Sequence, residues 1–250
     1  MDNPLHFQEL YSNIKNKNVC KTSYGNSVYS DLWYADTKNK ICITFTPRGG
    51  CSISFQQYLD IVGLLDDGLK YDNFIHNYRV DIFNKCIEYR NIQELIDEKY
   101  IFIKFIMNPY IRAVSIYRAQ ISNNCTFREY LKKKLDGTLI LNENDTLHDN
   151  LQYIDEEEKI ITKYIKINEN EIYQIKLFDE TPYIIDVNKY TSIHHAIKQK
   201  HTNFCGDIPR IDVNENLPIS YKYFYDSEIK QMVDTLYKND IEKYGFNFLE

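Results

Sequence analysis

The sequence has no long apolar run. None of its hydrophobic stretches approaches the ~18 residues that a membrane-spanning helix needs, and the opening Met1-Asp2-Asn3-Pro4 is polar and acidic, unlike a secretory signal peptide. The formal net charge of −6 and the pI of about 5.6 disfavour a broad surface for nucleic acid or anionic lipid. We therefore expect a cytoplasmic or soluble intracellular protein with no membrane span and no nucleic-acid partner.

Glycine, proline and linker-like segments are scarce. The 250 residues include 8 Gly and 6 Pro, and no stretch rich in Ser and Gly interrupts the chain. A chain of this length can bury one sizeable core. The composition predicts a single domain over residues 1–250, with residues 1–40 as a variable lead-in.

Paired cysteines and the common nucleotide-binding motifs are also absent. The six cysteines form no C-x-x-C pair, which argues against a zinc ribbon or a thioredoxin-type centre and favours reduced thiols. His194, His195 and His201 lack the i, i+4 spacing of helical zinc ligands, so no metal site is predicted. The chain contains neither G-x-x-x-x-G-K-[ST] nor G-x-G-x-x-G.

The chain does contain an apolar strand that runs into a glycine-bearing loop and then a helix. Alternating apolar residues predict a strand over Ile41–Phe45, and Pro47 ends it because proline has no backbone donor. Gly49 and Gly50 let the backbone approach a ligand, and the following helix presents N–H groups and a positive dipole end. Arg48 adds a charge that can fork onto phosphate or sulfate oxygens. This corner predicts a phosphate site.

A second strand-loop-helix corner lies at residues 100–118. Its apolar strand breaks at Pro109, which fits the first turn of a helix. Arg112 and Ser115 are three residues apart and share a helix face near its N-terminal end, where they can hold a second phosphate. Two such corners predict an α/β fold with a parallel sheet.

Together the corners resemble the nucleotide-binding elements of sulfotransferases that use 3′-phosphoadenosine-5′-phosphosulfate, especially the carbohydrate, Golgi-type branch. PRGGCS at 47–52 is similar to the family's P-K-x-[GA]-[CS]-[ST], and MNPYIRAVSIY at 107–117 to R-[DE]-P-x-x-R-x-x-S-x-Y. A closing helical segment at 225–246 is a third likeness. The resemblance implies a P-loop-like three-layer α/β fold, with a central mainly parallel sheet flanked by helices.

The resemblance also implies roles for individual residues. Arg48 stands where the family's lysine bridges the 5′-phosphate and the sulfuryl group. Ser115 would meet the 3′-phosphate, and Arg112 would support the loop or the ligand. The cradle of the 5′-phosphate would be formed by Gly49, Gly50, Cys51 and Ser52.

Two positions depart from the family pattern. Met107 stands where the family has an arginine that binds the 3′-phosphate, and Asn108 replaces its acidic neighbour. Lys104 lies three residues earlier on a strand and hence on the opposite face, so it cannot substitute. Weaker binding of the cofactor, or a changed cofactor, is therefore left open.

Sulfuryl transfer needs a base for the acceptor hydroxyl, and two histidines are candidates. His76 lies between the corners, where several carbohydrate sulfotransferases place theirs. His148, with Gln152, resembles the family's H-x-x-x-Q segment beside the acceptor. Each histidine has the alternative of an ordinary polar role. The acidic run 155–158 could supply a carboxylate base, although such runs usually form a solvated face.

The leading hypothesis is a metal-free sulfotransferase with 3′-phosphoadenosine-5′-phosphosulfate as co-substrate and a hydroxyl acceptor, expected to be a saccharide. The alternative is a non-catalytic protein that binds a nucleotide or a glycan on a degenerate sulfotransferase scaffold. A divergent P-loop kinase is a third hypothesis, and the absence of a Walker lysine and of a clear Mg²⁺-binding carboxylate counts against it. The oligomeric state is open.

Overall fold

The computed structural model describes residues 4–24, 32–120, 124–167, 172–177, 180–190, 202–215 and 218–248. Their contacts divide the chain into two compact units. Unit 1 comprises Met1–Ile106 and Ile154–His195, and unit 2 comprises Met107–Tyr153 and Ala196–Glu250. The expectation of a single domain over 1–250 stays a prediction.

Unit 1 is built around a six-stranded sheet with the strand order β4-β1-β2-β3-β5-β6. Strand β2 runs antiparallel to β1 and β3, and the other pairings are parallel. The strands are β1 (Val19–Thr22), β2 (Trp33–Asp36), β3 (Ile41–Phe45), β4 (Glu88–Tyr89), β5 (Ile101–Ile106) and β6 (Lys163–Lys166). The expected lead-in thus supplies two strands of this sheet. A separate antiparallel hairpin consists of β7 (Ile172–Lys176) and β8 (Pro182–Asp186).

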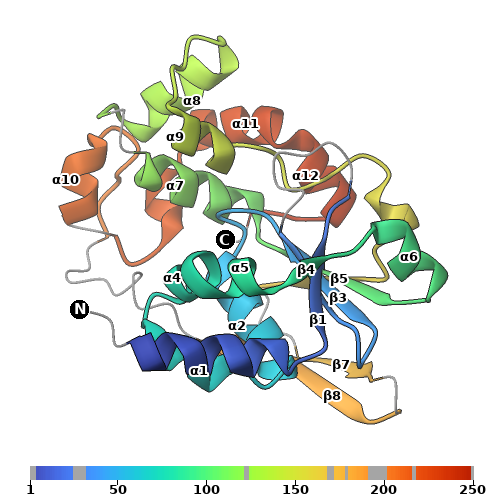
Figure 1. Ribbon diagram of the computed structural model, residues 1–250. Helices are drawn as coiled ribbons and strands as arrows, with labels where there is room; N and C mark the ends of the chain where they lie inside the picture. Colours follow the sequence, from blue (N-terminus) through green and yellow to red (C-terminus); the bar gives the residue numbers. More distant parts are fainter. Residues whose placement is uncertain are drawn as a thin grey trace. The chain divides into compact units, whose positions relative to one another are not determined.

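Helices of unit 1 flank the sheet on both faces. Helices α1 and α2 pack on one face, and α6 packs on the other (Figure 1). The α-helices are α1 (Pro4–Lys15), α2 (Cys51–Ile61), α3 (Leu65–Tyr71), α4 (Ile75–Tyr78), α5 (Asn84–Cys86) and α6 (Ile92–Asp97). A π-helical turn η1 (Arg79–Phe83) joins α4 to α5, and two short 3₁₀ turns are η2 (Glu157–Lys159) and η3 (Val187–Lys189). The predicted α/β class, with a mostly parallel central sheet flanked by helices, is confirmed.

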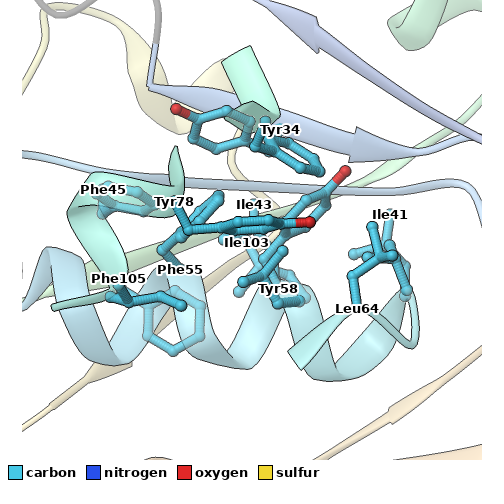
Figure 2. Close-up of a cluster of buried hydrophobic side chains, with 14 of the residues drawn as sticks. Tyr34, Ile41, Ile43, Phe45, Phe55, Tyr58, Leu64, Tyr78, Ile103 and Phe105 are labelled. Atoms are coloured by element: carbon cyan, nitrogen blue, oxygen red, sulfur yellow. The ribbon is translucent and has the colours of Figure 1, made fainter. Parts of the chain in front are cut away.

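The alternation of side chains along the strands builds two cores in unit 1. On β3, Ile43 and Phe45 face the α2 side, whereas Cys42 faces the α6 side. The α2 side holds a cluster of aromatic rings in which Tyr34 packs 5.3 Å from Phe55, centroid to centroid (Figure 2). These rings fix the end of β3 against the start of α2, and thereby position the loop between them.

Unit 2 is helical in its described part. Its α-helices are α7 (Pro109–Ala119), α8 (Phe127–Leu135), α9 (Glu143–His148), α10 (Arg210–Glu215), α11 (Ser227–Leu236) and α12 (Lys238–Tyr244), with the 3₁₀ turn η5 (Tyr221–Phe224). Tyr117 on α7 and Phe127 on α8 belong to its buried core, with ring centroids 5.2 Å apart. No helix within the described ranges is long and apolar enough to cross a membrane.

Candidate functional site

The loop between β3 and α2 is a tight turn with two left-handed residues. Strand β3 ends at Phe45, and the Gly49 N–H donates to the Thr46 carbonyl at 2.9 Å. Arg48 has a φ of +58° and Gly50 a φ of +85°. Arginine carries a Cβ, so this conformation strains it by about 1–2 kcal/mol. The turn therefore presents Arg48 in a geometry that glycine would adopt more easily.

Gly50 is packed against a side chain of the protein itself. A Cβ added at Gly50 would lie 2.0 Å from Cδ1 of Ile167, the residue that follows β6. The Ser54 N–H and hydroxyl both donate to the Gly50 carbonyl, each at 3.0 Å. Gly50 thus serves the close approach of β6 to the loop, and its sequence-predicted contact with a ligand stays a prediction.

His76 lies at this loop, as the sequence hypothesis required. From α4, its Nε2 lies 2.9 Å from the Ser52 hydroxyl and 3.4 Å from the Cys51 thiol, both in the first turn of α2. The Phe74 ring stands edge-on to the imidazole, with centroids 4.9 Å apart. The structure therefore gathers Arg48, the cradle residues 49–52 and His76 into one cluster, which we call the first corner.

The environment of His76 disfavours its protonated form. Burial, and then the positive charges of Arg79 and Arg48, lower the pKa of His76 from 6.5 to about 3. The imidazole is therefore neutral at physiological pH, and it exchanges a hydrogen bond with the Ser52 hydroxyl. A neutral imidazole can accept a proton, but neighbouring negative charge is needed to hold that proton.

Sequence reasoning missed Arg79. Its guanidinium carbon lies 5.8 Å from the centroid of the Phe45 ring and 5.9 Å from that of Phe55. The guanidinium therefore lies near the junction of β3 and α2. The i, i+3 spacing from His76 was the pattern that could have found it, because residues so spaced share a helix face.

We expect stability to fall as acid protonates His76 in the unfolded chain. The native pKa is depressed, so the unfolded state binds more protons between about pH 6.5 and about pH 3, and the folded state loses stability as pH falls through that window. Between about pH 6.5 and about pH 5 the loss amounts to about 2 kcal/mol. Urea unfolding at the two pH values measures it. His76→Gln should remove this part of the slope, and an unchanged slope would refute the assignment.

The second corner begins with a capped helix. The Asn108 side chain accepts from the Tyr110 N–H at 3.0 Å, and Pro109 occupies the first helical turn as predicted. Asn108 also donates to the Asn247 carbonyl at 3.0 Å. The residue that replaces the family's acidic neighbour is therefore a helix cap.

Arg112 and His148 lie together in unit 2. Arg112 is fully buried in α7, and its Nη2 donates to the His148 carbonyl at 3.4 Å, a long hydrogen bond. Ser115 is half-buried one turn further along α7. The roles of Arg112, His148 and Ser115 stay predictions.

The backbone at Met107 is held by the side chain of Gln152. Gln152 accepts from the Met107 N–H and donates to the Met107 carbonyl, both at 2.8 Å. The backbone N–H groups of Gln152 and Tyr153 in turn donate to the buried Asp240 carboxylate. Gln152, expected beside the acceptor, thus fixes the start of the second corner within unit 2.

Lys104 has a partner of its own on the α6 side of the sheet. Its ammonium and the Glu157 carboxylate form an ion pair in which both side chains are almost fully buried. The expectation that the acidic run 155–158 forms a solvated face is therefore wrong for Glu157. Its carboxylate also accepts from the Ile154 N–H at 3.0 Å, so it belongs to the core.

The predicted site residues fall into the two units. Unit 1 holds the first corner, and unit 2 holds Arg112, Ser115 and His148. His194, His195 and His201 lie outside the described residues. Within the described part, all six cysteines are free thiols, and no group of three or more His, Cys, Asp or Glu residues could hold a metal ion.

Comparisons with known proteins identify no relative of this chain. No family model matches the chain, and neither the curated proteins nor the solved structures contain a significant match. The functional argument rests on the geometry of the corners and on the motif resemblance.

Proposed function

We propose that this chain is a sulfotransferase with a P-loop-like core, transferring a sulfuryl group from 3′-phosphoadenosine-5′-phosphosulfate to a hydroxyl acceptor, for which a saccharide is the expected class. The observation that carries the proposal is the first corner, where Arg48, Ser52 and His76 meet at a left-handed turn before α2. The N-terminal turn of α2 adds N–H donors and a positive dipole end.

The residues of this corner fit a phosphosulfate group. Arg48 would stabilise the charge that develops on the 5′-phosphate oxygen as the sulfur–oxygen bond breaks. The backbone of Gly49 to Ser52 would hold the phosphate oxygens at the helix start. His76 Nε2 would take the proton of the acceptor hydroxyl as its oxygen bonds to sulfur. The co-substrate supplies the sulfuryl group, and no metal is needed for the displacement.

A bound oxyanion would also correct the weakness of His76 as a base. Two positive charges and burial depress its pKa in the ligand-free chain. Phosphate oxygens beside Arg48 would offset those charges and raise the pKa toward its ordinary range. His76 would then gain basicity when the co-substrate is bound.

The roles proposed for residues of unit 2 rest on the resemblance to sulfotransferases. Ser115 would donate to the 3′-phosphate, Arg112 would support α7 from its buried position, and His148 would lie on the acceptor side as a second candidate base. Met107, in place of an arginine, leaves the 3′-phosphate with one contact fewer than the family provides.

Calorimetric titration tests the nucleotide assignment. We expect adenosine 3′,5′-bisphosphate to bind in the micromolar range, and Ser115→Ala to weaken it by about 10- to 100-fold through the loss of a charge-assisted hydrogen bond. Adenosine 5′-monophosphate lacks the 3′-phosphate, so Ser115→Ala should leave its affinity unchanged. Ser12→Ala, at an exposed serine of α1, is the matched control. Equal affinity of wild type and Ser115→Ala for the bisphosphate would reject the role of Ser115.

The second candidate is a protein that binds the nucleotide or a glycan without transferring a group. Two observations favour it: the arginine of the family is absent at Met107, and the pKa of His76 is far below that of a working base. Transfer of labelled sulfuryl to a panel of saccharides separates the candidates. Bisphosphate binding without transfer to any acceptor would select the binding protein.

A further inference from the structure

Arg79 and His76 lie on one face of a helix that packs beside α2. His76 belongs to α4, and Arg79, three residues later, opens the π-helical turn η1 (Figure 1). His76 reaches the first turn of α2 through Ser52. Arg79 therefore projects toward the same corner from one turn further along the helix.

Two aromatic rings place the Arg79 guanidinium at the loop. Phe45 is the last residue of β3, and Phe55 lies one turn into α2, so the two rings bracket the segment that contains the predicted phosphate cradle. The guanidinium lies within 6 Å of both ring centroids, at 5.8 Å and 5.9 Å. Figure 2 shows both rings within the cluster of buried hydrophobic side chains. A contact between a cation and an aromatic ring uses none of the guanidinium N–H donors.

Two N–H donors of the Arg79 guanidinium have no hydrogen-bond acceptor among the described residues. Its Nε and Nη1 atoms are buried and make no hydrogen bond to any described residue. Arg79 also forms no ion pair within the described part of the chain. Buried donors are almost always paired, and a buried charge even more so. A guanidinium has two forked edges, Nε with Nη2 and Nη1 with Nη2, and each edge matches two oxygens of a tetrahedral oxyanion. Each edge of Arg79 contains one of the two donors that lack a described partner.

We propose that Arg79 is a further ligand-binding residue of the first corner, donating from one forked edge of its guanidinium, Nη2 together with Nε or Nη1, to the oxygens of a phosphoryl or sulfuryl group. The identity of that group as part of a nucleotide rests on the proposed function, whereas the oxyanion contact rests on Arg79 itself. The corner then carries two guanidinium groups, Arg48 from the loop and Arg79 from η1, for one doubly charged ligand.

The surroundings of His76 agree with an anion between these cations. Among the described residues, the groups that face the imidazole include the Ser52 hydroxyl, the Cys51 thiol, the Phe74 ring and the charges of Arg79 and Arg48. Both charges disfavour a protonated His76. An oxyanion held by Arg79 would relieve this repulsion. Arg79 thereby links ligand binding to the proton affinity of His76.

Calorimetry with two probes tests Arg79. Adenosine 3′,5′-bisphosphate and inorganic pyrophosphate are titrated into wild type, Arg79→Gln, Arg79→Lys and Lys85→Gln. Arg79→Gln should weaken both probes by about 10- to 100-fold, and Arg79→Lys, which keeps the charge without the fork, should weaken them less. Lys85→Gln removes an exposed positive charge from α5, which directly follows η1, and should leave both affinities unchanged. Thermal unfolding checks that each variant is folded, and Arg79→Lys remains informative if Arg79→Gln is not.

The outcomes separate this inference from the proposed function. Pyrophosphate binding that depends on Arg79, without binding of the bisphosphate, supports the oxyanion contact and rejects the nucleotide. Bisphosphate binding with equal affinity in wild type and Arg79→Gln keeps the nucleotide and overturns the role of Arg79. Failure of both probes to bind wild type overturns the oxyanion contact. As a further readout, saturating pyrophosphate should raise the pKa of His76 in wild type, measured by NMR, and raise it less in Arg79→Gln.

Discussion

Arg48→Gly is expected to abolish most of the proposed sulfuryl transfer while leaving the protein folded. The substitution removes the positive charge assigned to the breaking bond, and loss of one such stabilising group typically lowers the catalytic rate by about 100- to 1,000-fold. The φ of +58° at position 48 costs glycine nothing, so relief of strain offsets the greater freedom of glycine in the unfolded chain. The unfolding free energy should therefore change by less than about 1 kcal/mol.

Lys99→Gly is the matched control for Arg48→Gly. Lys99 has a φ of +62°, is exposed, and carries the same charge in the turn between α6 and β5. Its replacement should relieve strain in the same way and leave transfer and bisphosphate affinity unchanged. Single-turnover transfer, calorimetry and urea unfolding are measured on both variants. Wild-type transfer by Arg48→Gly would remove Arg48 from the mechanism.

Lys104→Met should destabilise the protein by about 3–5 kcal/mol, because it takes the ammonium from a buried carboxylate. Lys104 and Glu157 are exposed by 1% and 0%, so water cannot replace the lost partner. Urea unfolding at neutral pH measures the loss. Since Lys104 lies in β5 with its charge held in the core, the substitution should leave the bisphosphate affinity of the remaining folded protein unchanged.

The double variant Lys104→Met with Glu157→Gln separates charge from packing. Removing both charges from a buried pair is often close to neutral, so most of the stability should return. Glutamine also keeps an oxygen that can accept from the Ile154 N–H. A double variant that stays as unstable as Lys104→Met would mean that the aliphatic packing of Lys104, and not its charge, matters at this position.

The local parts of the fold could be predicted from the sequence. Alternating apolar residues gave β3 over Ile41–Phe45 with its observed bounds, and Pro109 marked the first turn of α7. The parity of strand residues predicted that Lys104 and position 107 lie on opposite faces, and the structure places the Lys104 ammonium on the α6 side of the sheet. Each of these predictions depends on residues within a few positions of one another, where backbone sterics and side-chain alternation decide the outcome.

The composition of the first corner was decided only by tertiary structure. His76 contacts Ser52, which lies 24 positions earlier in the sequence. Arg79 contacts the rings of Phe45 and Phe55 because the helix that carries it packs beside α2. No local pattern encodes such contacts, since burial of apolar surface brings distant segments together. For the same reason the sequence alone could not distinguish Glu157 from its acidic neighbours.

The sequence by itself determined the α/β class and the strand-loop-helix succession at each corner, because strand alternation, proline and glycine act locally. Tertiary structure decided which charges stand together. It lowered the pKa of His76 by burial beside Arg79 and Arg48, and it buried the Lys104–Glu157 pair, because electrostatic energies depend on distance and solvent exposure, which packing sets.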